Sequence, residues 1–193
     1  MKRHFIIPLT TLSALTFFSL AVQTDEVPAE TLARMQQLGA EFATPNQNHA
    51  FLRQFSGKWK TSSSVMGMEP SDGSASYSMI LDDRYLDGMH SGTFAGVPFQ
   101  GRLTIGYDNY KHKFVASFID DLGTSIRFAE GTLNQNRDTL SLWGAMDEWM
   151  TDEHDKPVMY RYKVLDSNHF EFEVHDLSLG SASLVITVHY TKQ

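Results

Sequence analysis

The sequence predicts an all-β fold: a single antiparallel barrel of about ten short strands, preceded by an N-terminal helical arm. Two observations predict it. Residues 101–108 and 114–120 alternate apolar and polar side chains, and a turn of Asp, Asn, Lys and His joins them. The same two-residue period recurs toward the C-terminus at near-regular intervals. Short strands separated by turn residues are typical of a barrel or sandwich, and not of alternating helices and strands.

The N-terminus has the pattern of a secretory signal. Residues 2–4 are basic, residues 5–22 are largely apolar, and residues 19–21 (Ser-Leu-Ala) favour cleavage after Ala21. Residues 21–23 (Ala-Val-Gln) are a weaker second site. The alternative is an uncleaved membrane anchor, although threonine and serine dilute the apolar run. We predict a signal peptide over residues 1–21, periplasmic or secreted localisation through Gram-negative-type export, and no stable membrane anchor after cleavage.

Composition excludes several classes of function. The 193-residue chain has a net charge of −7 and no cysteine, and loss of the signal would remove two further positive charges. An acidic chain without a basic stripe is a poor partner for nucleic acid or for an anionic membrane surface. The absence of cysteine excludes thiolate catalysis, iron–sulfur clusters and cysteine-ligated zinc. The mature chain is long enough for one domain with a sizeable core.

Residues 22–56 are predicted to form a helical arm. Pro28 suits the first turn of a helix, and apolar side chains follow it at helical spacing. Residues 44–46 (Thr-Pro-Asn) interrupt that pattern. A shorter helix then places apolar side chains on one face and ends at Gly57. This arm could serve as a lid, a plug or a docking element.

Residues 57–193 are predicted to form the barrel domain. The expected strands are Lys58–Met66, Ser74–Leu81, Arg84–Thr93, Phe99–Asp108, Lys113–Asp120, Ser125–Leu133, Thr139–Ala145, Val158–Leu165, His169–His175 and Ser183–Thr191. One apolar face per strand is what a closed antiparallel sheet requires. Side chains do not readily fill a barrel of ten strands, so we predict an internal cavity, with a solid barrel or a sandwich as the alternative.

Two stretches carry a resemblance to known families. Gly57-Lys58-Trp59 after a short helix is similar to the Gly-x-Trp entry into the first strand of lipocalin-like, or calycin, barrels. Residues 101–109 with 113–124 resemble the bacterial family called domain of unknown function 1579, which is grouped with the calycins. The resemblance extends from about Asn48 to the C-terminus and implies a calycin-like barrel.

The resemblance assigns no functional residues. Phe118 and Asp121 stand where the family has tryptophan and serine. The family brings no established catalytic residues, so none is carried over to this chain.

The predicted cavity favours binding of a small hydrophobic or amphipathic ligand, as a carrier, scavenger or sensor. The candidate ligand-binding residues, chosen by alternation and aromatic character, are Trp59, Tyr77, Phe99, Tyr107, Phe118, Trp143, Trp149, Tyr160 and Arg161. Trp59 also suits a plug at the barrel floor.

Three arginines lie mid-strand between apolar neighbours: Arg102, Arg127 and Arg161. An arginine that points into the barrel would anchor a carboxylate or phosphate head group, because its planar fork matches those anions. Alternation favours an outward direction for Arg102 and leaves Arg161 ambiguous.

Two other functions remain open. Asp108 and Asp120, if both lie near one barrel mouth, could perform acid–base chemistry in a hydrolase or isomerase. The chain could instead be an interaction module for another envelope protein, using the arm or the loop around Trp149. We assign no catalytic residues, no cofactor and no metal site, and the sequence does not indicate an oligomeric state.

Residues 147–155 are the strongest anomaly in composition, with acidic side chains, His154 and the apolar Trp149 and Met150 in one expected long loop. Oxygen ligands could hold a hard cation, but the spacing lacks the glycine bend and alternating ligands of a calcium loop. A solvated acidic hairpin tip is the simpler interpretation. The exposed Trp149 and Met150 predict a lid over the barrel mouth.

Overall fold

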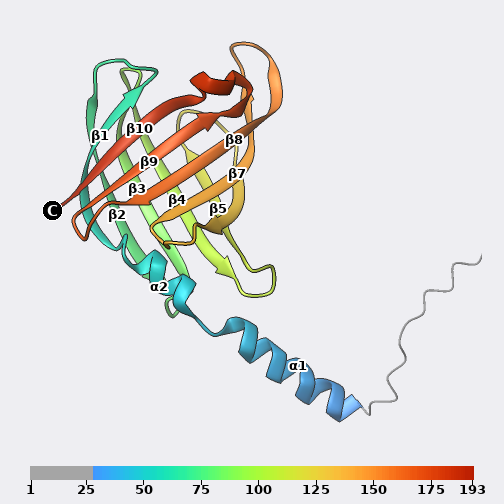
Figure 1. The fold of residues 1–193 in the computed structure, drawn as a ribbon. Helices are drawn as coiled ribbons and strands as arrows, with labels where there is room; N and C mark the ends of the chain where they lie inside the picture. The colour runs from blue at the N-terminus through green and yellow to red at the C-terminus, as the bar shows by residue number, and fades with distance from the viewer. Residues whose placement is uncertain (1–27) are drawn as a thin grey trace, which may run out of the picture. The chain divides into compact units, whose positions relative to one another are not determined.

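The computed structural model describes residues 28–193, which form a closed barrel of ten antiparallel strands preceded by helices (Figure 1). The strands are β1 (Gly57–Val65), β2 (Ser71–Ile80), β3 (Tyr85–Phe94), β4 (Val97–Asp108), β5 (Lys113–Asp120), β6 (Arg127–Leu133), β7 (Thr139–Glu148), β8 (Glu153–Val164), β9 (His169–Asp176) and β10 (Leu184–Lys192). A 3-10 helix, η1 (Leu177–Ala182), joins β9 to β10. The predicted fold class is confirmed.

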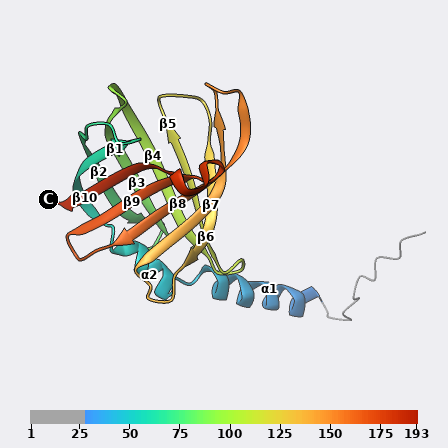
Figure 2. The same ribbon diagram turned by 45° about the horizontal axis from the view of Figure 1, so that its top comes forward.

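The barrel closes because its first and last strands pair. Trp59 of β1 lies opposite Ala75 of β2 on one side and opposite Lys192 of β10 on the other. Every other strand pairs with its neighbours in the chain, and Figure 2 shows the resulting up-and-down order around the barrel. An even number of strands lets β1 and β10 meet antiparallel, so no strand edge is left unpaired.

Local turn chemistry sets the hairpins. Ala95 and Gly96 both have positive φ (49° and 84°) and join β3 to β4 directly, with Phe94 opposite Val97. Positive φ at both central residues is the geometry that matches the twist of a two-residue hairpin. The sequence predicts that the second of these strands begins at Phe99, but Val97 and Pro98 already belong to β4.

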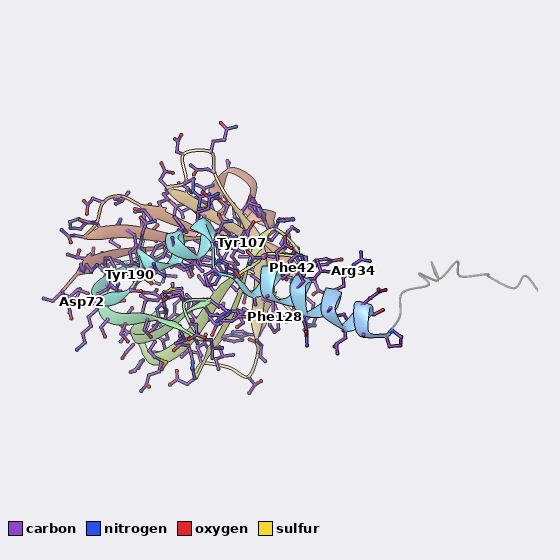
Figure 3. All side chains as sticks on the ribbon, turned by 90° about the horizontal axis from the view of Figure 1, so that it is seen from below. Arg34, Phe42, Asp72, Tyr107, Phe128 and Tyr190 are labelled. Carbon is purple, nitrogen blue, oxygen red and sulfur yellow. The ribbon has the colours of Figure 1, made fainter. Side chains whose placement is uncertain are left out.

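The second predicted helix is α2 (Gln47–Arg53), which covers one end of the barrel. Asn46 caps it by accepting a hydrogen bond from the Asn48 backbone N–H at 2.8 Å, and the His49 ring accepts one from the Asn46 N–H at 3.0 Å. Figure 3 looks at this end, where Tyr107 lies beside α2. We call this end of the barrel the closed end and the opposite end, with the β1–β2 and β3–β4 turns, the open end.

The core of the molecule lies at the closed end. The Phe170 ring meets Phe55 and Trp59 edge to face, with centroid distances of 4.9 and 4.7 Å, and stacks on Tyr190 at 3.9 Å. Trp59 is buried and donates its indole N–H to the Phe55 carbonyl at 2.8 Å. Aromatic contacts of this kind stabilise the packed floor beyond the burial of their surface.

Helix α1 (Pro28–Ala43) has no buried residues. Residues 38–193 form one compact unit, which contains the barrel. The predicted signal peptide, residues 1–21, lies outside the described residues. Within residues 28–193, neither α-helix combines the length and the apolar character that crossing a bilayer requires.

A cavity at the open end of the barrel

The barrel encloses a cavity of about 310 Å³ above the packed floor. Aromatic and aliphatic side chains line most of its wall, whereas β1–β3 contribute small polar residues such as Thr61, Ser63 and Ser91. The lining extends to Phe94, Leu122 and Phe128, whose side chains are also exposed to solvent. The cavity therefore opens at the end opposite α2, and its size lies at the lower limit of small-molecule sites.

Three of the predicted ligand-binding residues line this cavity: Phe99, Phe118 and Tyr160. The Phe118 ring lies over Gly101 on the neighbouring strand, where a methyl group would come within 2.5 Å of the ring. The ring of Tyr160 lies parallel to that of Phe172, with a centroid distance of 6.2 Å. Alternation along β4, β5 and β8 predicted the inward direction of all three.

Three other predicted residues pack in or against the core at the closed end. Trp59 and Tyr77 are buried, and the Tyr107 ring contacts Phe114 at 4.9 Å. Each points inward, as alternation predicts, but below the cavity rather than on its lining. A period of two indicates the face of a strand, not the height of a residue along the barrel.

Trp143 and Arg161, also predicted as lining residues, lie on the outer face. Leu142 and Tyr160 next to them in the sequence face inward, so the pleat turns Trp143 and Arg161 outward. Trp143 is half-exposed, and Arg161 pairs with Glu173 at 3.3 Å. Burial acts to raise the pKa of Glu173, but hydrogen bonds from Lys163 and His175 lower it to about 2.

Trp149 lies at the tip of the hairpin between β7 and β8, with 87% of its surface exposed. The expected long acidic loop is short, because β7 extends to Glu148 and β8 begins at Glu153 rather than Val158. Trp149 does not line the cavity, so the predicted lid is not closed over the mouth in this structure.

Asp147 forms hydrogen bonds within the acidic hairpin between β7 and β8. This carboxylate accepts a hydrogen bond from the Asp155 backbone N–H at 3.1 Å, and that bond, together with His154, lowers its pKa. Across residues 28–193 no group of three or more acidic or histidine side chains is arranged to hold a metal ion.

Asp108 and Asp120 do not share a mouth. Asp108 ends β4 at the closed end and caps the next turn by accepting the N–H groups of Tyr110 and Lys111 at 2.8 and 2.9 Å. Asp120 ends β5 at the open end, about 23 Å away along a strand with a rise of about 3.3 Å per residue. The condition for acid–base chemistry by this pair, a shared barrel mouth, is therefore not met.

One inward-facing histidine was missed by the sequence analysis. His90 lines the cavity, and its Nε2 lies 3.3 Å from the Tyr77 hydroxyl. Burial lowers the pKa of His90 to about 4, so the ring is neutral at physiological pH. Its ring meets those of Tyr77 and Phe118 edge to face at 5.3 and 5.8 Å. Gly88 and Gly92 lie two residues before and after His90 on β3 and so share its face, and this pattern was the signal in the sequence for its inward direction.

The open half of the cavity also holds an ion pair. The Arg127 Nη1 donates to Asp120 Oδ2 at 2.6 Å, and both side chains line the cavity. Phe118 lies 5.7 Å below the guanidinium carbon. Arg127 shares its face with Ala129 and Gly131, whose small size is suited to the interior of a barrel, and this signal could have predicted its inward direction.

Comparison with known proteins identifies the family of the chain. The family described as protein of unknown function (DUF1579) matches residues 44–192, which include α2 and all ten strands. The chain belongs to this family. No curated protein matches the sequence.

Among solved structures, the DUF1579 barrel is similar to designed β-barrels. A de novo designed fluorescence-activating barrel has 11% identity and a TM-score of 0.43, and the match covers 74% of this chain and 96% of that one. A redesigned barrel, mFAP0, bound to DFHBI, has 11% identity and a TM-score of 0.42, with coverage of 72% and 99%.

Proposed function

We propose that this DUF1579 protein binds a small hydrophobic or amphipathic molecule inside its barrel, as a carrier, scavenger or sensor. The observation that carries the proposal is a largely apolar cavity of about 310 Å³ that is sealed at one end by α2 and open at the other. Such a cavity removes apolar ligand surface from water, and its few polar groups can orient a ligand.

The surface around the open end supports this proposal. Exposed apolar side chains lie in or next to each of the five connections at the open end: Met66 and Met68, Phe94 and Val97, Leu122 and Ile126, Trp149 and Met150, and Leu177 and Leu179. Exposed apolar groups gathered at one end of a molecule mark a site of interaction. Here they surround the entrance through which an apolar ligand would pass.

A matched pair of variants tests the proposal. Val188 lines the cavity, whereas its neighbour Thr187 faces outward on the same strand. Val188→Trp, which fills the cavity, should weaken binding of the neutral dye Nile red about tenfold or more. The affinity of Thr187→Trp for the dye should stay within about twofold of the wild-type affinity. Equal binding by both variants would place the dye outside the barrel. Native mass spectrometry of the purified protein would also detect a resident ligand by its mass.

A second candidate function is docking to another envelope protein through the open end. The observation that favours it is Trp149, which is 87% exposed, beside Met150, which is 76% exposed. A photo-crosslinker at residue 149 should then trap one discrete partner in cells, and Val188→Trp should leave that crosslink unchanged. Loss of the crosslink in Val188→Trp would instead tie the contact to an occupied cavity.

We also propose that residues 1–21 direct export and are cleaved after Ala21. The basic residues 2–4 and the apolar run that follows support this. N-terminal sequencing of the mature protein should begin at Val22. A start at Met1 in the membrane fraction would indicate an uncleaved anchor.

A further inference from the structure

Arg127 is a cation in a cavity wall that is mostly apolar and that also includes the acidic residues Asp72 and Asp120. Among residues 28–193 it is the only lysine or arginine that lines the cavity, and His90 is neutral at physiological pH. The cavity therefore contains one fixed positive charge, placed in its open half near Leu122 and Phe128. A charge in an apolar site is costly unless it is paired, so its surroundings determine what it can do.

Asp120 holds the Arg127 guanidinium in place and accepts a hydrogen bond from only one of its nitrogens. The Asp120 side chain is 8% exposed and accepts two hydrogen bonds, from the Leu122 N–H at 3.1 Å and from Arg127 Nη1 at 2.6 Å. Arg127 is 34% exposed and has no other hydrogen-bond acceptor within the described part of the chain. Since a guanidinium carries five N–H donors, most of them remain available toward the cavity and its mouth.

Tyr160 adds a hydroxyl to the same cavity. Its ring stacks on Phe172, which fixes its orientation, and its hydroxyl has no hydrogen-bond partner among residues 28–193. Burial raises the pKa of Tyr160, and the charge of Arg127 acts in the opposite direction, so the hydroxyl is protonated and within electrostatic reach of the guanidinium. Two oriented donors thus face one apolar space.

We propose that Arg127 and Tyr160 bind the anionic head group of a single-chain amphiphile whose apolar chain occupies the cavity. This inference rests on the proposed function and names its ligand class. Hydrogen bonds between a guanidinium and a carboxylate are charge-assisted and strong, more so where water is excluded. The overall charge of −7 repels anions at long range, so preference for an anionic ligand depends on Arg127.

The volume of the cavity sets the length of the chain. A cavity of about 310 Å³ holds roughly ten times the volume of one liquid water molecule, about 30 Å³. A methylene group occupies a similar volume. Decanoate is therefore the anionic probe, and decanol is its neutral counterpart with the same chain.

The test compares two arginines that form equivalent ion pairs on opposite faces of the barrel wall. Arg127 pairs with Asp120 inside, and Arg102 pairs with Asp87 at 2.9 Å on the outer face, where it is 57% exposed. Calorimetric titration with decanoate and decanol, each below its aggregation concentration, should show decanoate binding about tenfold or more tightly to the wild type. Arg127→Gln should abolish this preference and leave decanol binding within about threefold, whereas Arg102→Gln should change neither.

Two further variants complete the test: one controls for a folding defect, and the other tests the Tyr160 hydroxyl. Arg127→Gln leaves Asp120 buried without its partner, so the double variant Asp120→Asn/Arg127→Gln, which is neutral, should give the same loss of preference. Tyr160→Phe should weaken decanoate binding a few-fold and leave decanol binding unchanged.

The outcomes separate this inference from the proposed function. If decanol and Nile red bind inside the barrel and decanoate has no advantage, or if the double variant keeps that advantage, the anchor is wrong and the proposed function stands. If neither the neutral probes nor decanoate bind, the proposed function fails and the anchor fails with it.

Discussion

The two ends of the barrel use the same ten strands but treat apolar side chains in opposite ways. At the closed end, Phe51, Leu52 and Phe55 from α2 and the turn after it are buried against Trp59 and the strands. At the open end, side chains such as Phe128, Trp149 and Met150 are exposed around the cavity mouth. Apolar packing that stabilises the fold is therefore concentrated at the closed end, which leaves the open end available for binding. A protein that filled both ends would gain stability and lose its cavity.

The same substitution at the two ends should give the largest contrast. Leu52 is fully buried under α2, whereas Leu122 is 44% exposed at the mouth. Leu52→Ala removes apolar contacts and leaves a void, so the free energy of unfolding should fall by about 2–5 kcal/mol. Leu122→Ala should lower it by less than about 1 kcal/mol. Urea denaturation followed by circular dichroism measures both, and similar losses would refute the division between the two ends.

Between the two ends, His90 should make stability depend on pH. The pKa of His90 is about 4 in the folded protein, whereas that of an unburied histidine ring is 6.5. As pH falls from 6.5 to 4, the unfolded chain takes up a proton that the folded protein does not, so stability falls by about 1.4 kcal/mol per pH unit and by about 3 kcal/mol in total. Above pH 6.5 both states are neutral and the effect is absent.

The variant His90→Gln isolates this effect. Acidic groups and His49 contribute to acid sensitivity equally in both proteins, so the difference between wild type and variant reports His90 alone. That difference, measured by urea denaturation, should shift by about 2 kcal/mol or more between pH 7 and pH 4.5. A constant difference would mean that the cavity hydrates His90 fully. His154→Gln, at the exposed hairpin tip, is the control.

The helix cap at the closed end should give a smaller effect. The Asn46 side chain accepts from the Asn48 N–H at 2.8 Å and donates to Asn109 Oδ1 at 2.7 Å. Asn46→Ala should reduce the free energy of unfolding by about 1 kcal/mol, since α2 loses its N-cap. Gln135→Ala, in the exposed turn after β6, should change it by less than about 0.5 kcal/mol. A loss no larger than in the control would show that packing alone holds α2 in place.

The sequence predicted the strands because their information is local. A period of two and the turn residues indicate where each strand runs and which face is apolar, and Gly57-Lys58-Trp59 indicates where the barrel begins. The height of a side chain along the barrel depends on register between strands, which the sequence does not show locally. Trp59, Phe118 and Tyr160 all point inward for the same reason, but register alone places only the last two on the cavity.

The candidate site was predicted less completely for the same reason. Aromatic character favours Trp143 as a lining residue, but its neighbour Leu142 occupies the inner face, so Trp143 points outward. Arg127 and Asp120 meet only because β5 and β6 pair with Phe118 opposite Arg127, and the connection between these strands does not fix that register. The ion pair, like the hydrogen bond between His90 and Tyr77, is a product of pairing between strands.

The smallest effect should come from the hairpin tip at the open end. Trp149 is 87% exposed and Trp59 2% exposed, so Trp149→Ser should change the free energy of unfolding by less than about 0.5 kcal/mol. The variant should also lose most of the tryptophan fluorescence that acrylamide quenches, because Trp59 is shielded by α2 and Trp143 is only half-exposed. A larger loss of stability, or quenching that is unchanged, would mean that Trp149 folds over the mouth in solution. In that case Trp149 would cover the cavity mouth in part of the population, and contacts at the mouth would contribute to stability as those at the floor do.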